Sequence, residues 1–130
     1  MARLTTTYEG GTAFRTECRG HSVSIDQPLD NGGADSAMTP PELFATSLAA
    51  CIGHYVANYC KQAGIDTEGM KVEADWATAD TPRRIGEMSF NVVLPGVPDS
   101  RRKAVEKVAS SCLLHATLEQ APELAITLQA

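Results

Sequence analysis

The chain has no excess of positive charge and no long uninterrupted apolar run. It carries 11 Lys and Arg against 16 Asp and Glu, which gives a net charge of −5 over 130 residues. An acidic protein of this kind lacks the basic surface that attracts nucleic acid or anionic membrane, so we expect neither as a partner. A membrane-spanning helix needs roughly 20 predominantly apolar residues, and every apolar stretch here is interrupted by polar groups before that length.

The first residues lack the apolar core of a secretory signal peptide, and we therefore expect a cytoplasmic protein. The cytosol keeps thiols reduced, so the four cysteines are not expected to form a structural disulfide framework. They are interpreted instead as buried small apolar side chains, metal ligands or redox thiols. A length of 130 residues predicts a single domain, residues 1–130, that can fold without a stabilising disulfide or metal ion.

The segment with the clearest helix signals begins at Thr39. This residue is a good helix N-cap and is followed by a proline at the first helical position. Glu42, three residues after Thr39, completes a capping box. Gly64 supplies the left-handed stop at the other end. These signals predict a helix over about residues 40–63. It is apolar nearly all round as far as His54, and we therefore expect it to be buried on most sides.

Strand-like segments flank this helix on both sides. Three precede it, at residues 3–9, 12–19 and 21–26, and two follow it, at residues 71–78 and 85–94. A second helix is predicted from Asp99 or Ser100 to about Gln120. Leu124, Ile126 and Leu128 alternate with other residues and predict a last short strand.

Grouping of strands and helices into blocks predicts an α+β fold, with helices packed on a mainly antiparallel sheet. A single small sheet covers only one side of a helix. The other faces of the nearly all-apolar long helix must be buried as well, and a second copy of the chain in a homodimer would bury them.

Cys51 and Cys112 lie on different predicted helices, so helix pairing could bring the two thiols together for redox chemistry. The alternative is that both are small buried hydrophobes. Each would lie about three turns inside its helix, where the helix dipole no longer acts, so a reactive thiolate would need a cationic neighbour. Cys60 cannot pair with Cys51, because nine helical residues separate them by roughly 13.5 Å on opposite faces. Cys60 is interpreted as either a packing residue or an exposed one, and Cys18 as an ordinary strand residue.

A histidine follows each of these two cysteines at the third position, namely His54 after Cys51 and His115 after Cys112. Residues at that spacing share one helical face, and four such ligands from two facing helices would suit tetrahedral zinc. The pattern is not a standard zinc-finger spacing. Ordinary, partly buried histidines are the favoured interpretation, and no metal site is predicted.

Taken together, the residues resemble the OsmC/Ohr superfamily, and within it the less characterised Pro-x-Glu-Leu branch. The resemblance spans almost the whole chain. It rests on Pro-x-Glu-Leu followed by Ala-Ala-Cys51, on Lys71-Val-Glu-Ala, and on Ser110-Ser-Cys-Leu-Leu-His115 before a final strand. It implies the OsmC-like fold, an intertwined homodimer and active sites at the subunit interface.

The resemblance also implies an antioxidant role in the oxidative stress response, by thiol-dependent reduction of organic hydroperoxides without haem, metal or other cofactor. Cys51 would be the peroxidatic cysteine and would become a sulfenic acid. Cys112 would resolve it as a disulfide, which a small or protein dithiol would reduce. The alternatives are a non-catalytic protein that binds a small apolar or thiol-reactive ligand at the dimer interface, and a structural or metal-assisted dimer.

One departure from the family pattern concerns a carboxylate. Members with established activity carry a glutamate ten residues before the first cysteine, where it orients an arginine. This chain has Pro41 at that position, and Glu42 stands nine residues before Cys51. Glu42 is therefore a candidate for the orienting carboxylate, with helix capping as the alternative role.

The second departure concerns the arginine that would activate the thiol. In active members it comes from the N-terminal strands, where Arg15 and Arg19 stand in this chain. In the less characterised branch a Pro-Arg pair occurs where this chain has Pro82-Arg83-Arg84. Arg15 and Arg83 are our two candidate site residues from these segments.

Overall fold

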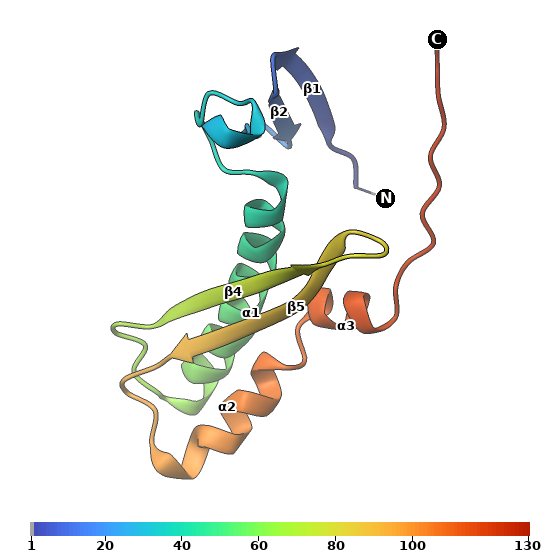
Figure 1. Ribbon diagram of the computed structural model, residues 1–130. Helices are drawn as coiled ribbons and strands as arrows, with labels where there is room; N and C mark the ends of the chain where they lie inside the picture. Colours follow the sequence, from blue (N-terminus) through green and yellow to red (C-terminus); the bar gives the residue numbers. More distant parts are fainter. Residues whose placement is uncertain (1) are drawn as a thin grey trace. The chain divides into compact units, whose positions relative to one another are not determined.

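The structure is a computed structural model that describes residues 2–130. They form two compact units, of which the first ends at Ala45 and the second begins at Thr46. Strands and helices mix as an α+β protein, as predicted (Figure 1). The division falls inside the long helix, so each unit is described separately.

The first unit holds a three-stranded antiparallel sheet in the order β1-β2-β3. The strands are β1 (Thr5–Gly10), β2 (Ala13–Cys18) and β3 (His21–Ile25). Register places Tyr8 opposite Phe14, and Phe14 opposite Ile25, so these three side chains share one face of the sheet. Arg15 projects from the other face, which is otherwise built from threonine, serine and glutamate side chains. The sheet is therefore apolar on one side and polar on the other.

The carboxylate of Asp26, directly after β3, accepts hydrogen bonds from neighbouring segments of the first unit. Asp26 is only 2% exposed and accepts hydrogen bonds from the hydroxyls of Thr12 at 2.5 Å and Ser36 at 2.6 Å. The backbone N–H groups of Ala34 and Ser36 donate to the same oxygen as the Ser36 hydroxyl, Oδ2, at 3.3 and 3.1 Å, whereas Thr12 donates to Oδ1. These donors, with Ser36 first and Thr12 second, hold the pKa of Asp26 well below its usual range. The side chain thus fixes the loop containing the short helix η1 (Leu29–Asn31).

The long helix α1 (Pro40–Ala63) begins and ends where the sequence predicts. The capping box is formed, since Thr39 N–H donates to Glu42 Oε1 at 2.9 Å and Glu42 N–H donates to Thr39 Oγ1 at 3.4 Å. At the other end Gly64 takes a φ of 68°, and the N–H of the next residue reaches the carbonyl of Cys60 at 2.9 Å. That arrangement is the Schellman motif.

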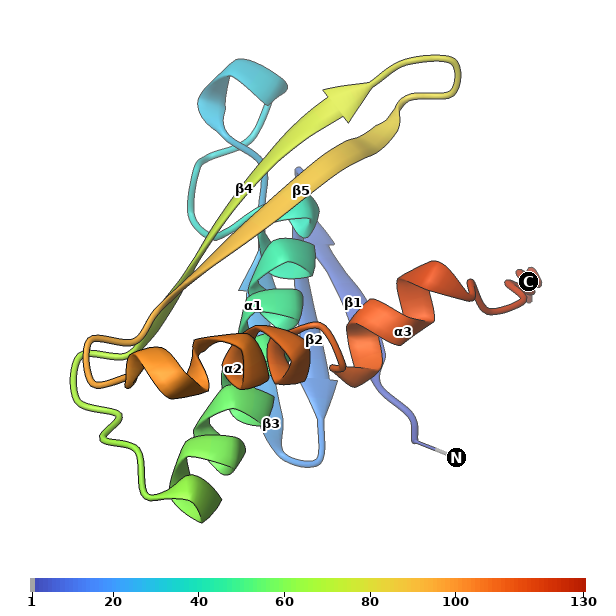
Figure 2. The same cartoon turned by 90° about the horizontal axis from the view of Figure 1, so that it is seen from below.

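The second unit packs the rest of α1 against the hairpin of β4 (Lys71–Ala79) and β5 (Arg84–Val93) and against α2 (Arg102–Ala109) (Figures 1 and 2). The short helix η2 (Asp99–Arg101) leads into α2, and α3 (Leu113–Glu119) follows it. The strands predicted at residues 71–78 and 85–94 are confirmed as β4 and β5. The fully buried core of this unit comes from α1, from α2 and from residues that flank the helices and strands: Ile52, Val56, Cys60, Ile65, Leu94, Val105 and Cys112.

Only one stripe of α1 is fully buried, at Ala45, Leu48, Ile52, Val56 and Cys60. The expectation that α1 is buried on most sides is therefore wrong for the single chain. The physical reason is geometric, because in the second unit the hairpin and α2 supply cover along one helical face. Other apolar side chains of α1 stay partly open, and Phe44 is 41% exposed.

Two predictions for the last third of the chain are wrong. The helix expected to run unbroken to about Gln120 is two helices, α2 and α3, separated at residues 110–112. The expected last strand is absent, since residues 121–130 have no helix or strand. Within the described chain the alternating side chains Leu124, Ile126 and Leu128 are 86%, 95% and 96% exposed. A strand needs a hydrogen-bonded neighbour, and the tail has none among the described residues.

Candidate functional site

The structure brings the side chains of Cys51 and Cys112 close enough to interact, and the Cys51 thiol is one of the causes that raise the pKa of the Cys112 thiol. Cys51 lies on α1 and is partly buried, whereas Cys112 is fully buried at the break between α2 and α3. Both cysteines are free thiols. Two neighbouring thiols, one of them more accessible than the other, are the arrangement that disulfide formation requires.

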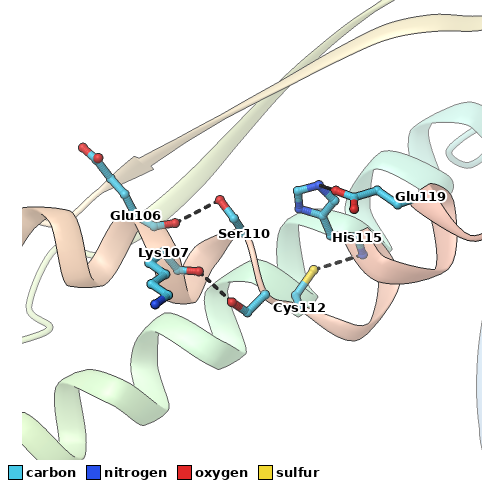
Figure 3. A network of polar contacts seen from close by, with 7 residues as sticks. Glu106, Lys107, Ser110, Cys112, His115 and Glu119 are labelled. Atoms are coloured by element: carbon cyan, nitrogen blue, oxygen red, sulfur yellow. Dashed lines mark hydrogen bonds and ion pairs between the residues drawn. The ribbon is translucent and has the colours of Figure 1, made fainter.

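The helix break that delivers Cys112 has a local cause in the two serines before it. Ser110 Oγ donates to the carbonyl of Glu106 at 3.0 Å, and Ser111 Oγ donates to the carbonyl of Lys107 at 2.7 Å (Figure 3). At Ser111 the hydroxyl takes the place of the backbone N–H, which donates instead to the carbonyl of Val108 at 3.0 Å, whereas the N–H of Ser110 still reaches the carbonyl of Glu106 at 3.1 Å. The helix ends there, and the chain turns to extended geometry at Cys112 (φ −67°, ψ 152°).

Cys112 is therefore the N-cap of α3, and its expected position in the middle of a helix is wrong. Its sulfur accepts a hydrogen bond from the backbone N–H of His115 at 3.3 Å (Figure 3). The pair Ser110-Ser111 is the signal that could have revealed the break, because serine favours caps and turns over helix interiors. The tertiary contact with Cys51 had no such local signal.

Burial is the main cause that raises the pKa of the Cys112 thiol. The hydrogen bond from His115 N–H acts in the opposite direction, and the contact with the Cys51 thiol raises the pKa further. The net direction is upward, so Cys112 is held as a neutral thiol near neutral pH. A neutral, buried thiol is a poor first nucleophile and a suitable partner for a sulfur that has already been oxidised.

The histidines that follow the two cysteines behave differently. His115 Nε2 pairs with Glu119 Oε1 at 2.7 Å, one turn further along α3 (Figure 3). His54 is exposed and meets the ring of Tyr55 edge-on, with 5.9 Å between ring centroids. Over residues 2–130, no three His, Cys, Asp or Glu side chains come together in a group that could hold a metal ion.

The other two cysteines lie apart from this contact. Cys60 is completely buried in the core, and burial raises the pKa of its thiol. Cys18 lies at the end of β2 in the first unit, where its thiol is 3.6 Å from the carbonyl of Arg3. Of the two interpretations that the sequence left open for Cys60, the buried position favours packing, and Cys18 lies in a strand as expected.

Glu42 lies in the first unit and forms the capping box with Thr39. The N–H of Thr39 lowers the pKa of the Glu42 carboxyl, and the Thr39 hydroxyl adds to this effect. The carboxylate is thereby held in its charged form at the start of α1. Its role as an orienting group for an arginine stays a prediction.

The candidate arginines have partners of their own. In the first unit, Arg15 Nη2 donates to Ser22 Oγ at 2.9 Å, and its Nε lies 3.5 Å from Glu17. In the second unit, Arg83 lies in the turn between β4 and β5, with its side chain 78% exposed and 3.7 Å from Asp80. The neighbouring Arg84 donates to two carbonyls of the same turn. These contacts leave the predicted roles of Arg15 and Arg83 untested.

A cavity of about 430 Å³ lies between β5 and α2. Its floor is apolar and includes Leu94 and Val105, both part of the core that also contains Cys112. Arg102 and Glu106 stand at its polar rim. Neither thiol lines it, so it is a feature of the second unit separate from the sulfur contact.

An α+β fold in which two cysteines from separate helical segments lie side by side describes this protein in general terms, and comparison with known sequences identifies its family. The model of the OsmC-like protein family matches residues 32–127. The chain belongs to this family. A comparison with curated proteins finds no match.

Solved structures agree with this assignment. A Psychrobacter arcticus protein described as an osmotic stress induced and detoxification response protein is 26% identical, with a TM-score of 0.82 over 90% of this chain and 88% of that one. An organic hydroperoxide resistance protein from Legionella pneumophila is 18% identical, with a TM-score of 0.71 over 91% and 88% of the two chains. One from Elizabethkingia anophelis is 23% identical, with a TM-score of 0.70 over 90% and 87%. The predicted OsmC-like fold is confirmed.

Among the helices of residues 2–130, none combines the length and the apolar character needed to cross a membrane.

Proposed function

We propose that this protein is a cysteine-based peroxidase that reduces organic hydroperoxides. The contact between the Cys51 and Cys112 thiols carries the proposal, because it joins an accessible thiol to a buried one across two helical segments. Membership of the OsmC-like family supports it, as do structural neighbours named organic hydroperoxide resistance proteins.

In the first step the Cys51 thiolate attacks the terminal oxygen of the hydroperoxide. The O–O bond breaks, the outer oxygen stays on sulfur as a sulfenic acid, and the alkoxide takes up a proton and leaves as an alcohol. Cys51 suits this role because it is the more exposed of the pair. No cofactor takes part in the step.

In the second step Cys112 attacks the Cys51 sulfur. A disulfide forms, and the hydroxyl of the sulfenic acid leaves as water with the proton of Cys112. A dithiol of a small molecule or of another protein then attacks the disulfide and leaves both cysteines reduced. The raised pKa of Cys112 fits this order, since the buried thiol stays neutral until its partner has been oxidised.

Stopped-flow peroxide consumption with a dithiol reductant tests the proposal. Cys51→Ser should abolish turnover, and Cys112→Ser should leave a sulfenic acid on Cys51 that dimedone traps and mass spectrometry detects. Cys60→Ala is the matched control and should keep the wild-type rate, because helical geometry prevents Cys60 from pairing with Cys51. Wild-type turnover no faster than that of Cys51→Ser would overturn the proposal, and thiols that persist after one equivalent of peroxide would favour ligand binding.

We extend the proposal to one carboxylate and one arginine at the reacting sulfur. A guanidinium near Cys51 would stabilise its thiolate and hold the leaving peroxide oxygen. Arg15→Lys and Arg83→Lys, measured as rates of sulfenic acid formation, distinguish the two candidates. Glu42→Gln reports on the carboxylate, and Thr39→Ala controls for the loss of the helix cap.

We also propose that the active form is an intertwined homodimer. The apolar side chains of the tail, Leu124, Ile126 and Leu128, are almost fully exposed and alternate as they do in a β-strand. A second copy would give the tail a strand to pair with and would cover the open faces of α1. Sedimentation analysis tests this proposal: the full chain should be a dimer, and a chain ending at Gln120 should dissociate more readily.

A further inference from the structure

The cavity of about 430 Å³ between β5 and α2 is a second candidate site, apart from the two thiols. Its volume falls in the lower part of the range for small-molecule binding sites, about 300–1,000 Å³. All of its lining residues belong to the second unit, and neither Cys51 nor Cys112 is among them. An inference drawn from this cavity therefore does not depend on the proposed peroxidase activity.

Both walls of the cavity are apolar because of residue spacing. Phe90 and Val92 alternate along β5, and Leu94 follows at the same spacing, so the three side chains lie on one side of the strand. Val105 and Ala109 are four residues apart on α2 and share one helical face. Figures 1 and 2 show α2 next to the end of β5, which brings these two faces together.

The chain itself does not cover these walls completely. Leu94 and Val105 are buried, but Phe90, Val92 and Ala109 are only partly buried. An alkyl chain placed in the cavity would remove the remaining apolar surface from water, which is favourable. The walls therefore suit the aliphatic part of a ligand.

The rim of the cavity holds one cation that lacks a partner. Arg102 lines the cavity, and its side chain forms no hydrogen bond or ion pair with any residue from 2 to 130. Two other polar side chains of the lining are already engaged. Asn91 Nδ2 donates to Glu73 Oε2 at 3.1 Å, and Ser110 Oγ donates to a backbone carbonyl at 3.0 Å. The Arg102 guanidinium therefore has donors left for a ligand.

The charge around Arg102 favours an anionic ligand. Between residues 99 and 107 the chain has four basic side chains against two acidic ones, although its overall net charge is −5. Glu106, one of the two acidic residues, also lines the cavity, but no ion pair joins it to Arg102 in the described chain. A guanidinium can form two parallel hydrogen bonds with a carboxylate, so this head group matches the rim.

We propose that the cavity between β5 and α2 is a binding site for a medium-chain carboxylate. The alkyl chain of the ligand lies against Phe90, Val92 and Ala109, and its carboxylate pairs with Arg102 at the rim. Binding is non-covalent, so the ligand is neither oxidised nor reduced at this site.

Isothermal titration calorimetry of the full chain with sodium octanoate tests the proposal and should show saturable binding. Arg102→Gln should weaken it about tenfold, because the charged hydrogen bonds are lost. Lys103→Gln is the matched control: it removes the same charge one residue further on, outside the lining, and should bind as the wild type does. Glu106→Gln should strengthen binding about threefold, because it removes a like charge beside the carboxylate.

Ligands that carry only one of the two features separate the chain from the head group. Acetate has the carboxylate without the chain and should show no saturation. Octan-1-ol has the chain without the charge and should bind about tenfold more weakly than octanoate. Heteronuclear NMR of the octanoate complex should place the largest shift changes in β5 and α2.

Absence of saturable octanoate binding to the wild type would overturn the inference, and so would equal losses in Arg102→Gln and Lys103→Gln. Shift changes centred on Cys51 would overturn it as well, because the ligand would then occupy a different site. Sedimentation with and without octanoate provides the last check. Octanoate that acts only by dissociating an oligomer would show that a second copy of the chain occupies the cavity. No measurement here uses peroxide, so failure of this inference and failure of the proposed peroxidase activity are distinguishable.

Discussion

The two helical segments that carry the cysteine pair are built in opposite ways. Helix α1 is continuous, begins with an oxygen-based capping box and ends in a Schellman motif. The segment from Arg102 to Glu119 is broken, and a cysteine sulfur caps its second helix. The continuous helix holds Cys51 on a framework that its own sequence stabilises. The broken segment places Cys112 by a local interruption, so its position depends on weaker contacts.

The largest effect is expected in the core of α1. Val56 is completely buried, and Val56→Ala should lower the free energy of unfolding by about 2 kcal/mol, because it removes buried methyl groups and leaves a cavity. Urea titration measures it. Leu118→Ala on α3 is the control, since Leu118 is 51% exposed and its loss should cost about 0.5 kcal/mol or less. An equal loss at Leu118 would show that α3 is covered in solution.

Removing the two serine hydroxyls should make the segment from Arg102 to Glu119 more continuous, as α1 is. In the double variant Ser110→Ala and Ser111→Ala, the hydroxyls no longer compete for the carbonyls of the previous turn, so helix should extend towards Cys112. Peroxide-induced Cys51–Cys112 disulfide formation should slow by about tenfold as the sulfur moves. Quenched mass spectrometry measures the rate. The control Thr117→Ala removes an equivalent hydroxyl bond inside α3, and an equal slowing there would contradict this account of the break.

Loss of the N-cap of α1 should have a smaller effect, on the free energy of unfolding. Thr39→Ala removes the hydroxyl that accepts from Glu42 N–H and should cost about 1 kcal/mol of unfolding free energy. Thermal denaturation followed by circular dichroism measures the loss. Thr39→Ser keeps the hydroxyl and should stay close to wild type. A serine variant as unstable as the alanine variant would show that the methyl group, and not the cap, is responsible.

The smallest effect is expected in the alkaline dependence of stability. The pKa values of Cys112 and Cys60 are raised in the folded state, so above the ordinary thiol pKa of about 8.5 the unfolded chain loses protons that the folded chain keeps. The unfolding free energy should therefore fall as pH rises from about 8 to 10. Urea titrations across that range measure the slope. Cys112→Ala should flatten it, because that substitution removes one of the two thiols with a raised pKa.

Most of the fold could be predicted from the sequence, because its signals are local. The capping box at Thr39, the glycine after α1 and the alternation within the five strands depend on neighbouring residues only. The break at Ser110-Ser111 had a local signal as well, but the apolar spacing of Val105, Val108 and Cys112 favoured one continuous helix. The last strand could not be predicted correctly because an alternating pattern records only a tendency to pair, and the single chain leaves residues 121–130 without a partner strand.

The sequence by itself determined both ends of α1, the approximate positions of the five strands and the exclusion of Cys60 as a partner for Cys51, since helical geometry alone separates those two sulfurs. Only the tertiary structure decided that Cys51 and Cys112 meet, that Cys112 caps a helix, and that burial raises its pKa. Those properties come from residues 61 positions apart being packed into one core. Local pattern does not encode such a contact, because it depends on how the hairpin and α2 pack on α1.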